Sequence, residues 1–170
     1  MPQCFSLDGP SILWTASGSS PYESSKSTVV AKMLSGRYRT AELCRHWSKS
    51  NSGGFCLQDT CHEVTEDLEH ILVICPAYHD ARNRIRKLWL SWSSEYPGLC
   101  NMIHLVTSSS PSVQVQFILT PWAFDGASML FSVYGIKIVN HMLYLTRTYA
   151  YALHKERLRL QGLLPKPFLH

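Results

Sequence analysis

The sequence predicts a mainly α-helical fold with little or no β structure. Apolar residues recur at helical spacing in several segments, the longest of which extends from Lys137 to Gln161. Glycine and proline residues follow these segments at the points where helices commonly end. A cluster of possible metal ligands lies between two of the segments, and a bound metal ion would supply the stability that such short helices lack.

The composition indicates one modest globular domain. Of the 170 residues, 45% are apolar and 16% charged, which is enough apolar material to bury a core. The most apolar stretch, 127–145, is interrupted by Lys137, Asn140 and His141, so we expect no membrane span. The N-terminal residues have no basic lead and no apolar segment, and no Asn-x-Ser/Thr acceptor occurs. We therefore expect an intracellular protein of the nucleus, the cytoplasm or both, with reduced cysteines.

The N-terminal half is expected to begin with a flexible serine-rich lead-in, residues 1–27. The first helix then starts at Ser27 and stops at Gly36. The hydroxyl of Thr40 is expected to cap a second short helix, whose apolar face carries Leu43, Cys44 and Trp47. Residues 28–96 form the predicted helical zinc-knuckle region.

Two further helices are predicted on either side of Pro76. The first is capped by Thr65 and presents Leu68, Ile71, Leu72 and Cys75 on one side. The second covers about 77–92, and its apolar face consists of Ala81, Ile85, Leu88, Trp89 and Trp92. A glycine-rich turn, residues 51–55, precedes the pair.

The C-terminal part, residues 97–162, is expected to be helical and to end in the long helix 137–161, followed by a tail, 163–170. Gly98 and the serine-rich stretch 107–112 bracket a short helix. Val113, Val115 and Phe117 alternate with glutamines, which is typical of a strand, but a run of this length fits one helical turn equally well.

The pattern C-x4-C-x8-H-x4-C, formed by Cys56, Cys61, His70 and Cys75, is the strongest chemical signal in the sequence. Zinc prefers four tetrahedral ligands of the thiolate and imidazole type. Three cysteines and one histidine complete such a site and leave no position for a catalytic water. The pattern therefore predicts a structural zinc knuckle that staples the small helical domain, with Zn²⁺ as the cofactor.

Other interpretations of these residues remain open. The cysteines are alternatively metal-free thiols, with Cys75 in a helix core and His70 exposed to solvent. His62 and Cys44 are possible substitute ligands. His62, however, adjoins Cys61 and would strain a shared tetrahedron, while Cys44 lies on an apolar helix face.

Two sequence runs around the ligands resemble a known family. LSGRYRTAELCRHW (34–47) and LEHILVICP (68–76) are similar to the C-terminal zinc-binding region that follows the reverse transcriptase domain in polyproteins of non-LTR (LINE-type) retrotransposons. The resemblance extends from about Ser27 to Leu90, and more weakly over 145–162. It implies a zinc knuckle that assists nucleic-acid binding, with the ligands Cys56, Cys61, His70 and Cys75. The first gap is longer here than in most short zinc knuckles.

The sequence lacks the catalytic motifs of four enzyme classes: reverse transcriptases, zinc metalloproteases, hydrolases with a nucleophile elbow and P-loop enzymes. A reverse transcriptase needs an Asp-Asp pair for two magnesium ions, and no such pair occurs, although the resemblance implies that a parent polyprotein would be an RNA-directed DNA polymerase. His62-Glu63 begins like a metalloprotease helix, but Glu66 stands where the second histidine ligand is needed. Neither a Gly-x-Ser-x-Gly elbow nor a P-loop is present. We therefore expect no enzymatic activity.

The net charge of +4 is unevenly distributed. Five of the twelve carboxylates lie between Cys56 and Cys75, where there is no Lys or Arg, so the rest of the chain has 16 basic and 7 acidic residues, a net charge of +9. Basic residues flank the ligand cluster on both sides and are the expected contacts to an RNA or DNA backbone: Arg37, Arg39, Arg45, Lys49, Arg82, Arg84, Arg86 and Lys87. Tyr38 or Trp47 is a candidate for stacking on unpaired bases.

These patterns predict a zinc-dependent module that binds RNA or DNA without marked sequence preference. The alternative is a structural or protein-interaction module, in which zinc holds a helical scaffold. A face that contains Trp89 and Trp92 would then contact a partner, such as the rest of a reverse transcriptase polyprotein. The basic stretch 147–159 is either a second nucleic-acid contact or the solvated side of a long helix.

Overall fold

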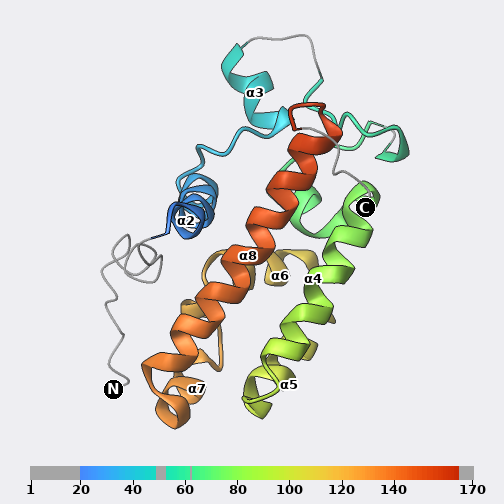
Figure 1. The fold of residues 1–170 in the computed structure, drawn as a ribbon. Helices are drawn as coiled ribbons and strands as arrows, with labels where there is room; N and C mark the ends of the chain where they lie inside the picture. The colour runs from blue at the N-terminus through green and yellow to red at the C-terminus, as the bar shows by residue number, and fades with distance from the viewer. Residues whose placement is uncertain (1–19, 49–52, 62, 165–170) are drawn as a thin grey trace, which may run out of the picture.

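A computed structural model of the chain describes residues 20–48, 53–61 and 63–164 (Figure 1). Within these residues the structure is helical and contains no strand; Phe55 and Thr65 pair only as an isolated antiparallel bridge. The prediction of a mainly α fold with little or no β structure is confirmed. None of the described helices combines the length and the apolar content that are needed to cross a membrane.

The described helices follow one another closely along the chain. The α-helices are α2 (Pro21–Leu34), α3 (Ala41–Ser48), α4 (His79–Trp92), α5 (Pro97–Thr107), α6 (Pro111–Leu119), α7 (Ala127–Tyr134) and α8 (Ile136–Leu160). Shorter helical turns cover Asp59–Cys61, His70–Ile74, Pro76–Tyr78 and Pro121–Ala123.

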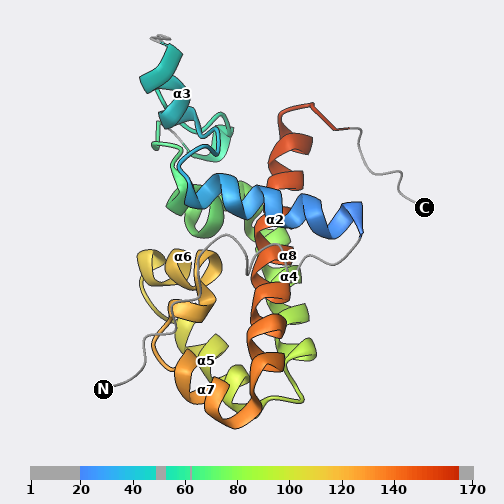
Figure 2. The same ribbon diagram turned by 90° about the vertical axis from the view of Figure 1, so that its left-hand side faces the viewer.

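Helix α8 is the centre of the structure. It begins after Gly135, whose φ of 66° allows the chain to turn sharply out of α7. Figures 1 and 2 show α4 beside α8, and α2 lying across α8. Five apolar side chains that recur at helical spacing along α8 are buried: Ile138, Met142, Leu145, Tyr149 and Leu153.

Side chains from the N-terminal and C-terminal regions share one hydrophobic core. Trp89 of α4 is 2% exposed, packs against the rings of Phe117 and Tyr149, and donates a hydrogen bond from Nε1 to the carbonyl oxygen of Leu145 at 3.0 Å. Leu88, which was expected beside it on the apolar face, is 40% exposed. A tryptophan with its indole N–H satisfied in the core is not part of a partner surface.

Helix α2 begins before the predicted position. Its first residue is Pro21 rather than Ser27, and the side chain of Ser20 caps it by accepting from the backbone N–H of Tyr22 at 3.3 Å. The prediction of a flexible lead-in up to residue 27 is therefore wrong from Pro21 onward, and residues 1–19 lie outside the described part. Tertiary packing explains the difference, because Lys26 is buried and donates to Thr148 of α8 at 3.2 Å.

The ambiguous segment around 113–117 is helical and forms α6. Pro111 occupies its first turn, where the missing N–H is not needed. The consecutive side chains of Phe117, Ile118 and Leu119 are all buried. A strand with one solvated face would bury only alternate residues. Burial of three consecutive residues instead requires packing on several sides of the segment, which agrees with the helix.

Candidate metal centre

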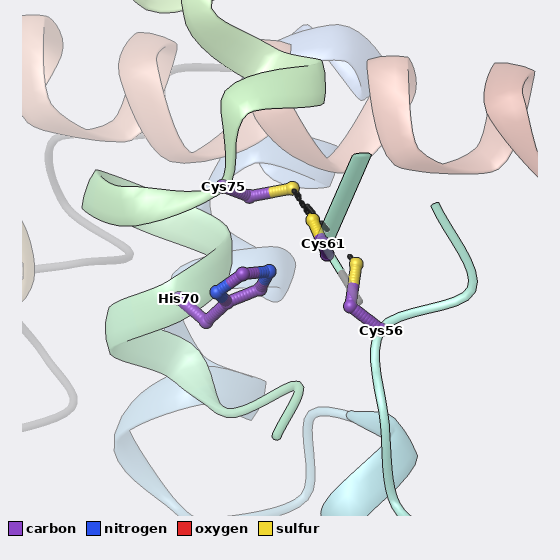
Figure 3. Close-up of side chains that lie close together, drawn as sticks. All are labelled: Cys56, Cys61, His70 and Cys75. Carbon is purple, nitrogen blue, oxygen red and sulfur yellow. Dashed lines mark hydrogen bonds between the residues drawn. The ribbon is translucent and has the colours of Figure 1, made fainter. Parts of the chain in front are cut away.

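Four side chains converge in the segment that joins α3 to α4 (Figure 3). Cys56, Cys61, His70 and Cys75 are all buried, and one ligand atom from each lies within 4.8 Å of the other three. The Sγ atom of Cys75 is 3.5 Å from that of Cys61 and 3.9 Å from that of Cys56. Thiolates bound to one tetrahedral zinc ion at 2.3 Å would be about 3.8 Å apart, so these separations fit a shared metal ion.

A hairpin-like loop positions the first two cysteines. The backbone N–H of Cys56 donates to the carbonyl oxygen of Val64 at 2.8 Å, and the N–H of Glu66 donates to Gly54 at 3.0 Å. Gly54 has a φ of 73°, and a Cβ atom there would lie 3.3 Å from the backbone of Glu42. The glycine-rich sequence therefore permits both the turn and the close approach of α3.

A π-helical turn positions the other two ligands. Residues five apart on an α-helix are separated by about 140° around its axis, so His70 and Cys75 would face different directions. The turn His70–Ile74 is instead π-helical, and the N–H of Cys75 donates to the carbonyl oxygen of His70 at 2.7 Å. Cys75 then leaves the helix with φ −50° and ψ 119°, the extended conformation that Pro76 favours in the residue before it.

The helix cap expected at Thr65 is wrong. Thr65 takes part in the bridge to Phe55, and the helix begins at Leu68. Asp67 is the cap, because its Oδ1 accepts a hydrogen bond from the backbone N–H of His70 at 2.7 Å. The cap thus holds a ligand residue directly.

The residues present fit a bound metal ion. His70 is 3% exposed, and neither of its ring nitrogens has a hydrogen-bond partner among the described residues. Burial lowers the pKa of His70, which favours the neutral imidazole that a metal requires. Burial raises the pKa of both Cys56 and Cys75, so a nearby cation is needed to stabilise their thiolates. A buried imidazole without partners beside three thiols is costly unless a metal ion completes the site.

Of the two alternative ligands, Cys44 is not part of this cluster. Cys44 is exposed, so the expected apolar face of α3 is not buried at this position. His62 lies outside the described residues. The interpretation in which His70 is solvated is also wrong, because His70 is buried.

Arg82 supports the centre from α4. Its guanidinium is buried and donates through Nη2 to the carbonyl oxygen of Cys75 at 2.7 Å and to that of Ile74 at 3.4 Å. The prediction that Arg82 contacts a phosphate backbone is wrong, because the side chain is directed into the protein. The guanidinium instead fixes the backbone of the last ligand.

Glu66 joins three parts of the structure beside the centre. It is 2% exposed, and its Oε1 accepts from the N–H of Ala41 at 2.9 Å and from Nη2 of Arg157 at 2.5 Å. Burial alone would lower the pKa of Arg157, but the hydrogen bond and negative charge of Glu66 outweigh it, so this pKa is raised. Glu66 therefore ties α3 and the metal loop to the last turns of α8. No local sequence pattern indicates this contact, because Glu66 and Arg157 are 91 positions apart in the chain.

The remaining basic residues have different environments. The side chains of Arg37, Arg39, Arg45, Arg84 and Lys87 are exposed. Arg86 is half-buried and donates to Oε1 of Gln114 at 2.8 Å, whereas Lys49 lies outside the described residues. Within the basic stretch 147–159, Arg147 and Arg157 are buried and Arg159 pairs with Glu156, so that stretch is not one solvated basic strip.

Tyr38 is unavailable for base stacking. It is 5% exposed, and its hydroxyl group is hydrogen-bonded to Nδ1 of His154 at 3.0 Å. The side chain of Trp47, the other candidate, is outside the described part of the structure.

We expect the free energy of unfolding to depend on pH through His154, whose Nδ1 is hydrogen-bonded to the hydroxyl group of Tyr38. Burial lowers the pKa of His154, and the charges of Arg157 and Lys32 lower it further. The pKa of His154 is therefore lower in the folded chain than in the unfolded chain. Neutral His154 contributes stability that is fully present above about pH 6.5, and this contribution is lost as the pH falls from there through the lowered pKa. Urea unfolding between pH 7.5 and 5.5 is expected to show a shallower pH dependence for His154→Gln than for the wild type. Identical slopes would contradict this role of His154.

The fold and the cluster together define a class: a helical protein with a buried Cys₃His group that can hold a metal ion and staple the chain between α3 and α4. No family model, curated protein or solved structure matches this chain. The resemblance to retrotransposon polyproteins stays a prediction.

Proposed function

We propose that this chain is a zinc-stabilised, non-enzymatic module that binds RNA or DNA, and that it derives from the C-terminus of a retrotransposon reverse transcriptase polyprotein. The observation that carries the proposal is the buried Cys₃His cluster next to helices with exposed basic side chains. Three thiolates and an imidazole favour Zn²⁺ over the hard cations Mg²⁺ and Ca²⁺, which prefer oxygen ligands. Four protein ligands leave no open position, so the ion has a structural role.

The metal ion would act on nucleic-acid binding through the scaffold. Bound to these four residues, it would join the loop that follows α3 to the turn that precedes α4, and both helices present exposed basic groups. The five exposed residues that remain from the predicted set are Arg37, Arg39, Arg45, Arg84 and Lys87. Contacts of this kind recognise the charge of the phosphate groups rather than the identity of the bases.

Binding to single-stranded RNA at a series of salt concentrations tests the proposal. Each phosphate contact adds roughly −0.7 to the slope of log Kobs against log salt concentration, so the five residues together contribute about −3.5 if all of them contact phosphates. Fluorescence anisotropy with a labelled uridine homopolymer and a DNA strand of equal length measures the slope and compares RNA with DNA. A slope near zero, or no binding at low salt, would contradict the proposed function.

A second candidate function is a scaffold that contacts another protein, such as the rest of a polyprotein. Trp89 cannot serve it, because it is in the core, and Trp92 is half-buried and packs against Tyr144. Apolar side chains are nevertheless exposed at the opposite end of α8 from the metal centre: Met129, Val133 and Ile136 are 66%, 66% and 55% exposed. A stable complex or self-association that persists when RNA binding is absent would favour this function.

A further inference from the structure

A pocket of about 590 Å³ lies between the end of α2, the segment that leads to α3 and the last turns of α8. Figure 1 shows these three parts of the chain at the same end of α8. The pocket is separate from the four buried metal ligands, none of which lines it. Its volume is within the range of about 300–1,000 Å³ that is typical of ligand sites.

The charge of the pocket is strongly positive. Lys32, Arg37 and Arg39 line it and are exposed, and no carboxylate is among its lining residues. None of the three forms an ion pair with a carboxylate in the described part of the chain. Arg157 also lines the pocket, but Glu66 neutralises it from the buried side. Three cationic residues without a carboxylate partner among the described residues therefore line one concavity.

The side chains at the inner wall are held in place. Tyr38 and His154 bond to each other at 3.0 Å, and the Arg157 guanidinium lies 5.7 Å from the centre of the Tyr38 ring. Val29 and Leu158 add apolar surface to the lining. The positive groups thus surround a structured pocket rather than a flat solvated helix face.

We propose that this pocket binds a phosphate group of a nucleic-acid strand through Lys32, Arg37 and Arg39. The proposal rests on the proposed function and deepens it, because it locates a binding position and adds Lys32 to the contacts. Two guanidinium groups offer paired N–H donors to phosphate oxygens, and the ammonium group of Lys32 adds a point charge. Phosphate fits this set better than a single carboxylate does, since it has more acceptor oxygens for three cationic donors.

Lys32→Gln tests the pocket, and Lys137→Gln is its matched control. Both lysines are exposed and both changes remove one positive charge, but Lys137 lies in the first turn of α8, away from the pocket. Lys32→Gln is expected to weaken uridine-homopolymer binding about three- to tenfold and to reduce the salt slope by about 0.7. Lys137→Gln is expected to change affinity less than about twofold.

The outcomes separate this proposal from the proposed function. If the wild-type protein binds RNA but the two variants lose affinity equally, the pocket is not the binding position and only this inference is overturned. If the wild-type protein does not bind RNA or DNA, both are overturned. If Lys32→Gln weakens binding to polyglutamate as much as to RNA, the pocket recognises negative charge rather than phosphate, which also overturns the inference.

The exposed thiol of Cys44 gives a second readout, because Cys44 also lines the pocket. Saturating uridine homopolymer is expected to slow alkylation of Cys44 by iodoacetamide in the wild-type protein. The same RNA concentration is expected to slow the alkylation of Cys44 less in the Lys32→Gln variant. An alkylation rate that RNA leaves unchanged would place the strand elsewhere and overturn the proposal.

Discussion

Replacing Cys61 with serine is expected to abolish the binding of one metal ion per chain and to lower the melting temperature by about 10 °C or more. Cys61 is 4% exposed, and its Sγ is 3.5 Å from that of Cys75. Without its thiolate only three ligands remain, and a structural zinc ion supplies folding free energy directly. A loss of about 4 kcal/mol corresponds to roughly 10 °C for a chain of this size. Elemental analysis and thermal unfolding of the same preparation measure both effects.

Cys44→Ser is the matched control for this substitution. It makes the same chemical change at an exposed cysteine outside the cluster, so metal content and melting temperature should stay at wild-type values. A Cys61→Ser protein that retains one zinc ion per chain would contradict the ligand assignment. If Cys44→Ser lost the metal instead, Cys44 would be a ligand.

Replacing Glu66 with glutamine is expected to destabilise the protein by about 3–5 kcal/mol, because it leaves the Arg157 guanidinium buried without its counter-charge. The carboxylate of Glu66 accepts from Nη2 and Nε of Arg157 at 2.5 and 3.4 Å and from the N–H of Ala41 at 2.9 Å. Glutamine has nearly the same shape but cannot offer two negatively charged oxygens. The free energy of unfolding in urea measures the loss.

Glu156→Gln provides the comparison, since it removes the same charge from a more exposed pair. Glu156 and Arg159 lie three residues apart on α8, with side chains that are 20% and 33% exposed. Pairs of this kind contribute about 1 kcal/mol or less. Equal losses for the two variants would mean that burial of the Glu66–Arg157 pair has no special energetic weight.

The sequence predicted the elements that depend on local periodicity. The long helix was expected at 137–161 and is observed at Ile136–Leu160, and the helix expected at 77–92 is observed at His79–Trp92. A repeated apolar stripe next to glycine or proline contains enough information to place such helices. Element boundaries that depend on remote contacts were missed, as at Pro21, where α2 gains stability by packing on α8.

The candidate site was predictable in composition but not in geometry. The spacing of cysteine and histidine identified four residues that the structure brings together. It did not reveal the π-helical turn between His70 and Cys75, although a five-residue separation on one helix already conflicts with α-helical geometry. This conflict with α-helical geometry is a feature of the sequence that points to a π-helical turn.

The roles of the basic residues could not be derived from sequence. Arg82 and Arg84 are two positions apart on α4, so they face different sides of the helix, and only the position of the core decides which one is buried. Arg82 holds the carbonyl group of Cys75, whereas Arg84 is exposed. Charge alone does not distinguish a structural guanidinium from a surface contact.

The sequence by itself therefore determined the helical class and the four side chains that can hold a metal ion, because both follow from residue type and local spacing. Tertiary structure alone decided which charged side chains are available to a ligand. Glu66 and Arg157 are 91 positions apart and meet only because α8 returns past the metal loop. The pocket around Lys32 likewise exists only where α2 and α8 meet, since its walls come from segments that no local pattern connects.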